Sequence, residues 1–205
     1  MRDGERGFTL IELLVALTIF AMLSAAGVLL LGNAVSAQGQ VKEKLDAQGD
    51  MLRVVALIDQ DMRNATPRIS RTDTGLLAPA FYARAPGGKN PFLLFVRGGR
   101  ANLDDAPRSD LQKVEYWLNE GKLERRVYPL LDGASPDEPA LLADGVEGLE
   151  IAWRDDKGEW IDSWEGKDPR DLPLAMRMTM RRTGQAPLTL LFRIGEGSAT
   201  EAGNG

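Results

Sequence analysis

Hydrophobic residues fill the first part of the chain in one nearly unbroken block. Phe8–Leu31 carries a single charged residue, Glu12, and the next charge along the chain is Lys42. As a helix rising about 1.5 Å per residue, such a block is long enough to cross the core of a bilayer with some tilt. The pattern therefore predicts a transmembrane helix over residues 8–31, preceded by a short polar leader, residues 1–7.

Helical spacing continues beyond this block. Apolar residues recur at helix-like intervals at Val41, Leu45, Leu52, Val55 and Met62, with charged residues such as Asp61 between them on the expected polar face. The residue before a proline is disfavoured in a helix, so Thr66-Pro67 predicts an end. We expect residues 32–66 to continue the helix and its apolar stripe to cover the core of the following domain.

After Pro67 the apolar residues alternate with polar ones, which is typical of strands. The segments with this pattern are Phe92–Val96, Val114–Leu118, Leu123–Tyr128, Leu149–Trp153, Met176–Met180 and Leu188–Ile194. Asn119–Lys122 is expected to form a four-residue hairpin loop, and Asp155–Gly158 to turn its strand toward a segment from Trp160 to Trp164.

A helix followed by strands predicts an α+β fold in which an antiparallel sheet packs on the long N-terminal helix. Residues 67–194 would form this β-rich domain, and the small, polar residues 195–205 a disordered tail.

Composition narrows the function. The net charge is −5 and no basic cluster stands out, which argues against nucleic acid as a partner. The chain has no cysteine and no histidine, so disulfides, Ser-His-Asp and Cys-His sites and histidine-bound metals are excluded. Lys, Glu, Asp and Tyr could still act as acids or bases, so a membrane-tethered periplasmic enzyme that uses carboxylates is an alternative. Our expectation is no enzyme, no cofactor and no metal site.

Glu12 is the unusual residue of the hydrophobic block, because a carboxylate within a membrane span is costly and usually marks a function. Arg2 and Arg6 favour an N-terminus on the cytoplasmic side. A cleaved secretory signal with its site near Ala34-Val35-Ser36 is one alternative, although the apolar run is long for it. A plain single-span anchor is another, and it leaves Glu12 unexplained.

Gly7-Phe8-Thr9-Leu10-Ile11-Glu12 resembles the class III prepilin signal of the type IV pilin-like family. The resemblance implies a type IV pilin-like fold and cleavage by prepilin peptidase between Gly7 and Phe8, followed by N-methylation of Phe8. It also implies that Glu12 pairs with the N-terminal amine of a neighbouring subunit during assembly.

Val114–Asp132, Leu141–Trp164 and Leu172–Met180 resemble, in this order, the J class of minor pseudopilins in bacterial type II secretion. The resemblance implies a subunit of the pseudopilus tip, with I- and K-class partners and the H class as a further candidate. Such a subunit would prime assembly and support export of folded proteins, and secreted substrates are candidate contacts. Its anchor would lie in the inner membrane, with the C-terminal domain in the periplasm. A minor pilin of a type IV pilus or DNA-uptake filament is the alternative.

Two tryptophans in polar surroundings, Trp160 and Trp164, are candidate partner contacts, whereas Trp153 is expected in the core. The acidic pairs Asp104-Asp105, Asp137-Glu138 and Asp155-Asp156 could bind calcium, but none has EF-hand spacing. Each lies in an expected turn, where Asp side chains favour local hydrogen bonds, so we interpret them as solvated turns.

Overall fold

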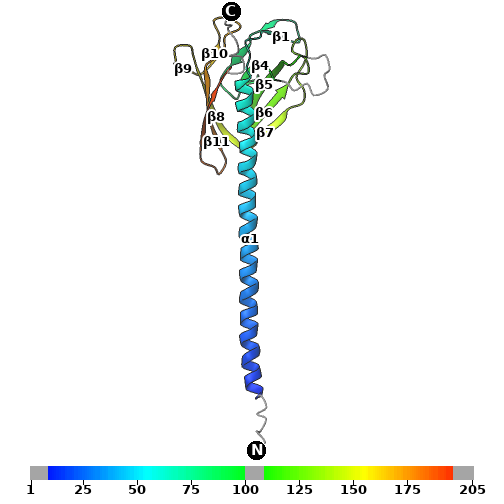
Figure 1. Ribbon diagram of the computed structural model, residues 1–205, viewed down its shortest axis with the longest axis vertical. Coiled ribbons are helices and arrows are strands. Elements are labelled where there is room, and N and C mark those ends of the chain that lie inside the picture. The colour runs from blue at the N-terminus through cyan, green and yellow to red at the C-terminus, as the bar shows by residue number, and fades with distance from the viewer. Residues whose placement is uncertain (1–8, 100–108, 196–205) are drawn as a thin grey trace, which may run out of the picture. The chain divides into compact units, whose positions relative to one another are not determined.

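The computed structural model describes residues 9–99 and 109–195, apart from the side chains at 34, 40, 43, 44, 46 and 47. It divides the chain into two compact units, Met1–Asp50 and Met51–Gly205. One helix, α1 (Leu10–Arg63), runs through both units (Figure 1). The predicted leader, the cleavage site at Gly7 and Phe8, and nearly all of the predicted tail lie outside the described residues.

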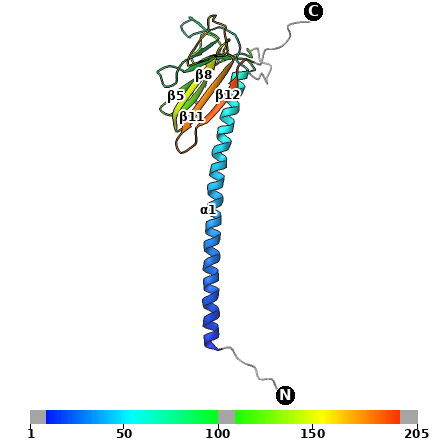
Figure 2. The same ribbon diagram turned by 90° about the vertical axis from the view of Figure 1, so that its left-hand side faces the viewer.

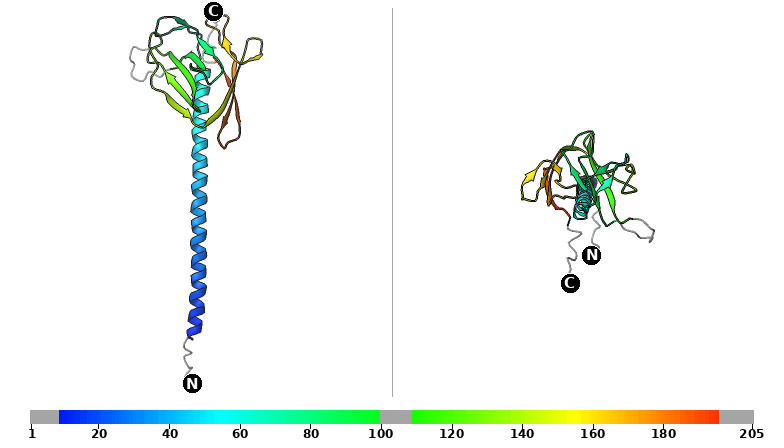
Figure 3. Two further views of the ribbon diagram at one scale, coloured as in Figure 1. Left: turned by 180° about the vertical axis from the view of Figure 1, so that it is seen from behind. Right: turned by 90° about the horizontal axis from the view of Figure 1, so that it is seen from above.

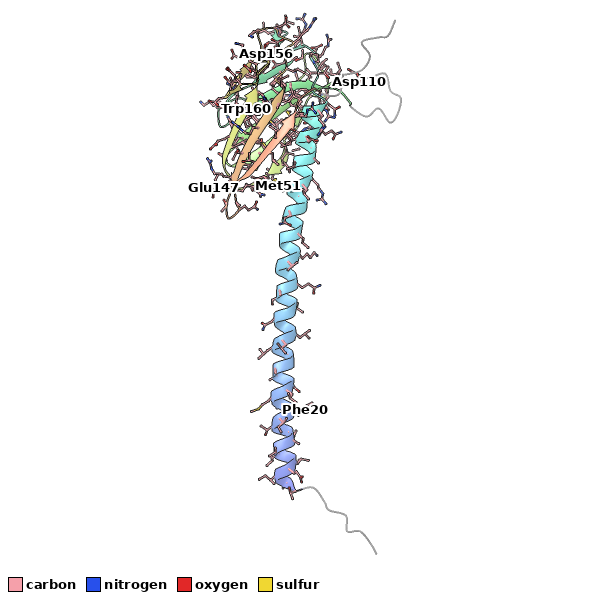
Figure 4. The ribbon with its side chains drawn as sticks, turned by 60° about the vertical axis from the view of Figure 1, so that its left-hand side comes forward. Phe20, Met51, Asp110, Glu147, Asp156 and Trp160 are labelled. Carbon is pink, nitrogen blue, oxygen red and sulfur yellow. The ribbon has the colours of Figure 1, made fainter. Side chains whose placement is uncertain are left out.

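The first unit consists, as far as it is described, of α1 up to Asp50. By length and composition, Leu10–Gly39 could cross a membrane, and within 9–99 and 109–195 no other helix passes this test. Its apolar side chains are exposed, Leu10 to 78% and Phe20 to 69%, and Figure 4 shows Phe20 pointing outward from the helix. A patch of this size suits lipid or another protein as its surroundings.

The second unit contains the strands, which pair antiparallel throughout the described residues. One sheet has the order β10 (Trp164–Glu165), β3 (Phe81–Ala83), β4 (Leu93–Arg97), β5 (Gln112–Asn119), β6 (Lys122–Val127), β7 (Ala140–Ala143). A second has the order β12 (Leu188–Arg193), β11 (Ala175–Arg182), β8 (Val146–Arg154), β9 (Trp160–Ile161). β1 (Ser70–Arg71) and β2 (Leu77–Ala78) form a small third sheet. The α+β prediction is confirmed, although its single sheet is divided.

The core lies where the last turns of α1 meet the two larger sheets. Seen from above in Figure 3, the end of α1 lies between strands of both sheets. Val54, Ile58 and Met62 belong to the same buried cluster as Tyr116 and Trp153. The predicted inward faces are confirmed, since Leu149, Ile151, Met176, Met178 and Met180 are all buried. Full burial of each large apolar side chain stabilises by roughly 1.5–3 kcal/mol.

The predicted stripe of α1 contacts the core at its C-terminal end, where Met62 is completely buried and Val55 packs against the buried cluster. Leu52 is 69% exposed and does not cover the core, and in the first unit Val41 and Leu45 are 56% and 60% exposed. Periodicity indicates that a helix has an apolar face, but it does not indicate what that face meets. In the second unit the buried face of α1 includes Met62 and, in part, Val55 of the predicted stripe, whereas Leu52 remains at the surface.

The hairpin between β5 and β6 has a tighter turn than predicted. Asn119 pairs with Lys122, so the loop contains two residues rather than four. Glu120 has φ 49° and Gly121 has φ 77°. Two successive positive φ values are typical of the type I′ turn, whose twist matches that of the strands and lets pairing continue to the turn itself.

The segment from Trp160 to Trp164 is not one strand. Ile161 in β9 pairs with Trp153 of β8, whereas Trp164 in β10 pairs with Ala83 of β3. The chain therefore leaves one large sheet and joins the other within a few residues. Because of this crossing, Trp164 is buried, whereas Trp160 in β9 is only half-buried.

The second face of β5 is also covered, here by polar contacts. Lys113 and Glu115 are each only 3% exposed. Glu115 accepts hydrogen bonds from Trp117 Nε1 (2.7 Å) and Tyr128 Oη (2.8 Å), and Lys113 Nζ donates to the Arg71 carbonyl (2.9 Å). Burial lowers the pKa of Lys113, and burial with the Glu115 contact raises that of Tyr128.

Candidate functional site

Glu12 lies in the first turn of α1, where it faces Thr9. Its Oε2 is 3.4 Å from both the backbone N and the Oγ1 of Thr9. In return, the Thr9 Oγ1 is 3.4 Å from the backbone N of Glu12. A Thr followed three residues later by Glu, with these reciprocal contacts, is a capping box. This capping box was not predicted, although the Thr-x-x-Glu spacing is visible in the sequence.

This arrangement holds the carboxylate at the start of the helix. The N-terminal end of a helix carries partial positive charge and unpaired N–H groups, so an acid there is stabilised. The 3.4 Å contacts are long, and the Glu12 side chain is at the surface. Glu12 is therefore accessible to a cation from another chain.

A second acidic residue of α1, Asp61, lies at the other end of the helix and is completely buried. Its carboxylate is paired with Arg97 of β4 and with Arg125 of β6, whose Nε and Nη2 lie 2.7 and 3.1 Å from Oδ2 and Oδ1. The Tyr116 hydroxyl of β5 donates to Oδ2 at 2.7 Å. Three adjacent strands thus converge on one carboxylate of the helix.

The ion pairs and hydrogen bonds around Asp61 have a structural role. Burial and the neighbouring Asp61 carboxylate raise the pKa of Tyr116 well above its ordinary value, so the hydroxyl stays protonated and donates. Burial lowers the pKa of Arg125, but its hydrogen bond and ion pair with Asp61 outweigh this and raise it. With their raised pKa values, Tyr116 and Arg125 both stay protonated near neutrality, so they hold the helix on the sheet and are unsuited to proton transfer.

The predicted position of Asp61 on the polar face of the helix is wrong, because the residue is completely buried. Asp61 follows Ile58 by three residues and therefore shares its buried face. The available signal was on the strands: Arg125 alternates with Leu123, which is fully buried, and so points to the same side of the sheet. A buried arginine needs an acidic partner.

The candidate contact residues Trp160 and Trp164 differ in position. Trp164 is 7% exposed and its Nε1 donates to the Asp171 carbonyl at 3.3 Å, so it packs in the core and offers little surface to a partner. Trp160 is half-buried, and the Arg177 guanidinium lies 4.5 Å from its ring centroid. Trp153 is fully buried, as expected.

Of the described acidic pairs, Asp155-Asp156 belongs to a turn, whereas Asp137-Glu138 lies outside any turn and the Asp137 N–H donates to the Val127 carbonyl at 2.8 Å. Asp155 Oδ1 accepts hydrogen bonds from the backbone N–H groups of Lys157 (3.0 Å) and Glu159 (2.7 Å). Asp104-Asp105 lies outside the described residues. Across 9–99 and 109–195, no group of three or more acidic side chains has the arrangement of a metal site.

The family of the chain follows from two sequence matches. The N-terminal residues 2–28 match the prokaryotic N-terminal methylation motif. The family "Type II secretion system (T2SS), protein J" matches residues 29–194, which is most of the chain. The chain belongs to the type II secretion system protein J family.

Individual protein J relatives are similar to this chain over nearly its full length. The chain is 31% identical to type II secretion system protein J of Escherichia coli over 184 residues, 88% of this chain and 91% of the relative. It is 29% identical to that of Klebsiella pneumoniae over 197 residues, 94% and 96% of the two chains. A chain of the GspK-GspI-GspJ complex from enterotoxigenic E. coli matches with TM-score 0.63 and 28% identity, over 72% of this chain and 97% of that chain.

This protein J family member is a minor pseudopilin, a membrane-anchored structural component of the type II secretion pseudopilus. The pilin-like α+β fold is shared with the solved complex. The match over 29–194 covers the strands described above, including the residues around Asp61. The family thus decides between the secretion filament and the pilus alternative.

Proposed function

We propose that this pseudopilin is a subunit of the pseudopilus tip that works by assembly with I- and K-class pseudopilins and without catalysis. A relative was solved in a GspK-GspI-GspJ complex, which supports such partners. Residues 8–31 would span the inner membrane, with the leader 1–7 in the cytoplasm and residues 67–194 in the periplasm. The tip would prime the filament and assist export of folded proteins.

The observation that carries this proposal is the apolar surface of α1 beyond its membrane-spanning part. Val41, Leu45 and Leu52 are 56–69% exposed, yet they follow the candidate span that ends at Gly39. Water is an unfavourable environment for an apolar stripe of this kind. Helices of neighbouring subunits would bury it, as in other helix-in-groove and coiled-coil associations.

Glu12 would act at the moment of assembly. In the single chain its carboxylate reaches back to Thr9. When prepilin peptidase removes residues 1–7, Phe8 gains an ammonium group, and a neighbour's Phe8 would replace Thr9 as the partner of Glu12. Pairing offsets the cost of holding both charges in lipid and sets the axial register of the subunits.

Processing is tested by the intact mass of the full chain after coexpression with and without prepilin peptidase. We expect the peptidase to remove Met1–Gly7 and to leave a methyl group on Phe8. Gly7→Val should block cleavage, because a branched side chain would stand beside the scissile bond. Gly4→Val changes another leader glycine in the same way and should be processed normally. Retention of the leader by the unchanged chain in the presence of the peptidase would contradict the proposal.

A further inference from the structure

β8 is covered by a neighbouring strand along only part of one edge. β11 pairs with it from Val146 to Arg154, but on the other side β9 reaches only Trp153 and Arg154. Among the described strands, none continues the sheet past Ile161 on this side. The stretch 148–152 of β8 is therefore an open edge of the four-stranded sheet, whose strands β8, β11 and β12 are labelled in Figure 2.

Leu149 and Ile151 direct their backbone N–H and C=O groups toward this open edge. The Asp155 N–H donates to the Glu159 carbonyl at 2.9 Å, so Asp155 faces the β9 side of the sheet. Backbone groups alternate in direction along an antiparallel strand, which places Leu149 and Ile151 on the same side as Asp155. Ala152 then faces β11. The side chains of Leu149 and Ile151 are buried, so only their N–H and C=O groups are presented at the edge.

A hollow of about 430 Å³ runs along this edge. Leu149 and Ile151 form part of its lining, together with Glu150 and Ala152 of β8 and Arg177 and Thr179 of β11. Residues from outside the four-stranded sheet complete it, namely Ala85 and Pro86 after β3 and Asp162 between β9 and β10. Its volume falls within the usual range of ligand sites.

The charged residues that line the hollow differ in their contacts. Glu150 is paired with Arg181 at 2.6 Å, and Arg177 lies over the Trp160 ring at 4.5 Å. Glu150 and Arg177 both line the hollow, but each already has a partner within the chain. Asp162 is exposed at the hollow and contributes a carboxylate to it. A basic side chain is therefore the complement that this site favours.

We propose that the open edge of β8 accepts an extended strand from another pseudopilin of the filament, with a basic residue of that strand beside Asp162. Only an extended backbone offers donors and acceptors at the spacing that Leu149 and Ile151 require, and β-strand addition is a common mode of recognition. The added strand would take up the line of β9 beyond Ile161. This inference extends the proposed assembly function by naming the surface and the chemistry of the contact.

The partner is identified by crosslinking in cells that assemble the filament. A photoreactive amino acid replaces the exposed Ala85 in the full chain, and mass spectrometry locates the crosslinked peptide. We expect an adduct with another pseudopilin, at a segment that contains Lys or Arg.

Asp162→Lys should lower the yield of this adduct at least about tenfold, since like charges then meet. Asp110→Lys is the matched control, because Asp110 is also exposed and is labelled far from Trp160 in Figure 4. An adduct with a second copy, with the chain itself or with a secreted protein, or equal loss in both variants, would overturn the proposal.

Amide hydrogen exchange tests the backbone contact without any substitution. In the detergent-solubilised full chain, the Leu149 and Ile151 amides should exchange at least about tenfold more slowly when the other pseudopilins are bound, because hydrogen bonding protects them. The Ala152 amide faces β11 and should be slow in both states. Unchanged exchange at residues 149 and 151 in the assembled complex would also overturn the proposal.

Discussion

Asp61→Ala should lower the free energy of unfolding of the second unit by about 3–5 kcal/mol, because it leaves two buried arginines without their shared carboxylate. Asp61 is completely buried, and the paired side chains of Arg97 and Arg125 are only 7% and 12% exposed. Water cannot replace the lost partner without opening the core. Urea denaturation of the detergent-solubilised full chain, followed by tryptophan fluorescence, measures the change.

Asp59→Ala is the matched control, since it removes the same side chain from the same helix two residues earlier. Asp59 pairs with Arg63 at 2.8 Å, but the two side chains are 36% and 50% exposed. Pairs of this kind contribute about 0–1 kcal/mol. Equal destabilisation by the two substitutions would show that the buried cluster does not fix the end of α1 on the sheet.

Glu12→Ala should leave the strand unit folded and lower incorporation into the filament tip at least about tenfold, because an N-terminal ammonium group would then lack its partner in the membrane. The measurement is the amount of the chain recovered with its partner pseudopilins from membranes, relative to the total chain present. Glu12→Gln preserves the size of the side chain and removes its charge, so it should fail as well.

Thr18→Ala is the control for a polar change within the same apolar stretch. The Thr18 hydroxyl donates to the Leu14 carbonyl at 2.8 Å and carries no charge. Its loss should not change incorporation. If Glu12→Ala were incorporated as well as Thr18→Ala, the ion-pair role of Glu12 would have to be abandoned.

Much of the fold could be predicted because the local pattern of apolar and polar residues determines the helix and the strands. The helix, the antiparallel strands and their inward faces at Leu149, Ile151 and Met178 follow from periodicity of burial. The hairpin loop was predicted too long, since Asn and Lys at 119 and 122 look like turn residues although they still pair. Where a strand changes sheets, as between Trp160 and Trp164, periodicity carries no information.

Of the functional features, some can be found in the sequence and others only in the folded structure. Glu12 stands out from the sequence because a single charge interrupts an apolar block. Asp61 does not, because its partners are residues 97, 116 and 125, and only the folded sheet brings them together. The open edge of β8 is equally invisible in the sequence: it exists because β9 ends at Ile161, which depends on the path of the chain toward β10.

The most direct test of the account is copurification of the full chain with I- and K-class pseudopilins after coexpression with prepilin peptidase and extraction in detergent. We expect a complex that contains the chain without residues 1–7 together with both partners. Recovery of the processed chain alone, with both partners present in the same membranes, would contradict its role as a tip subunit.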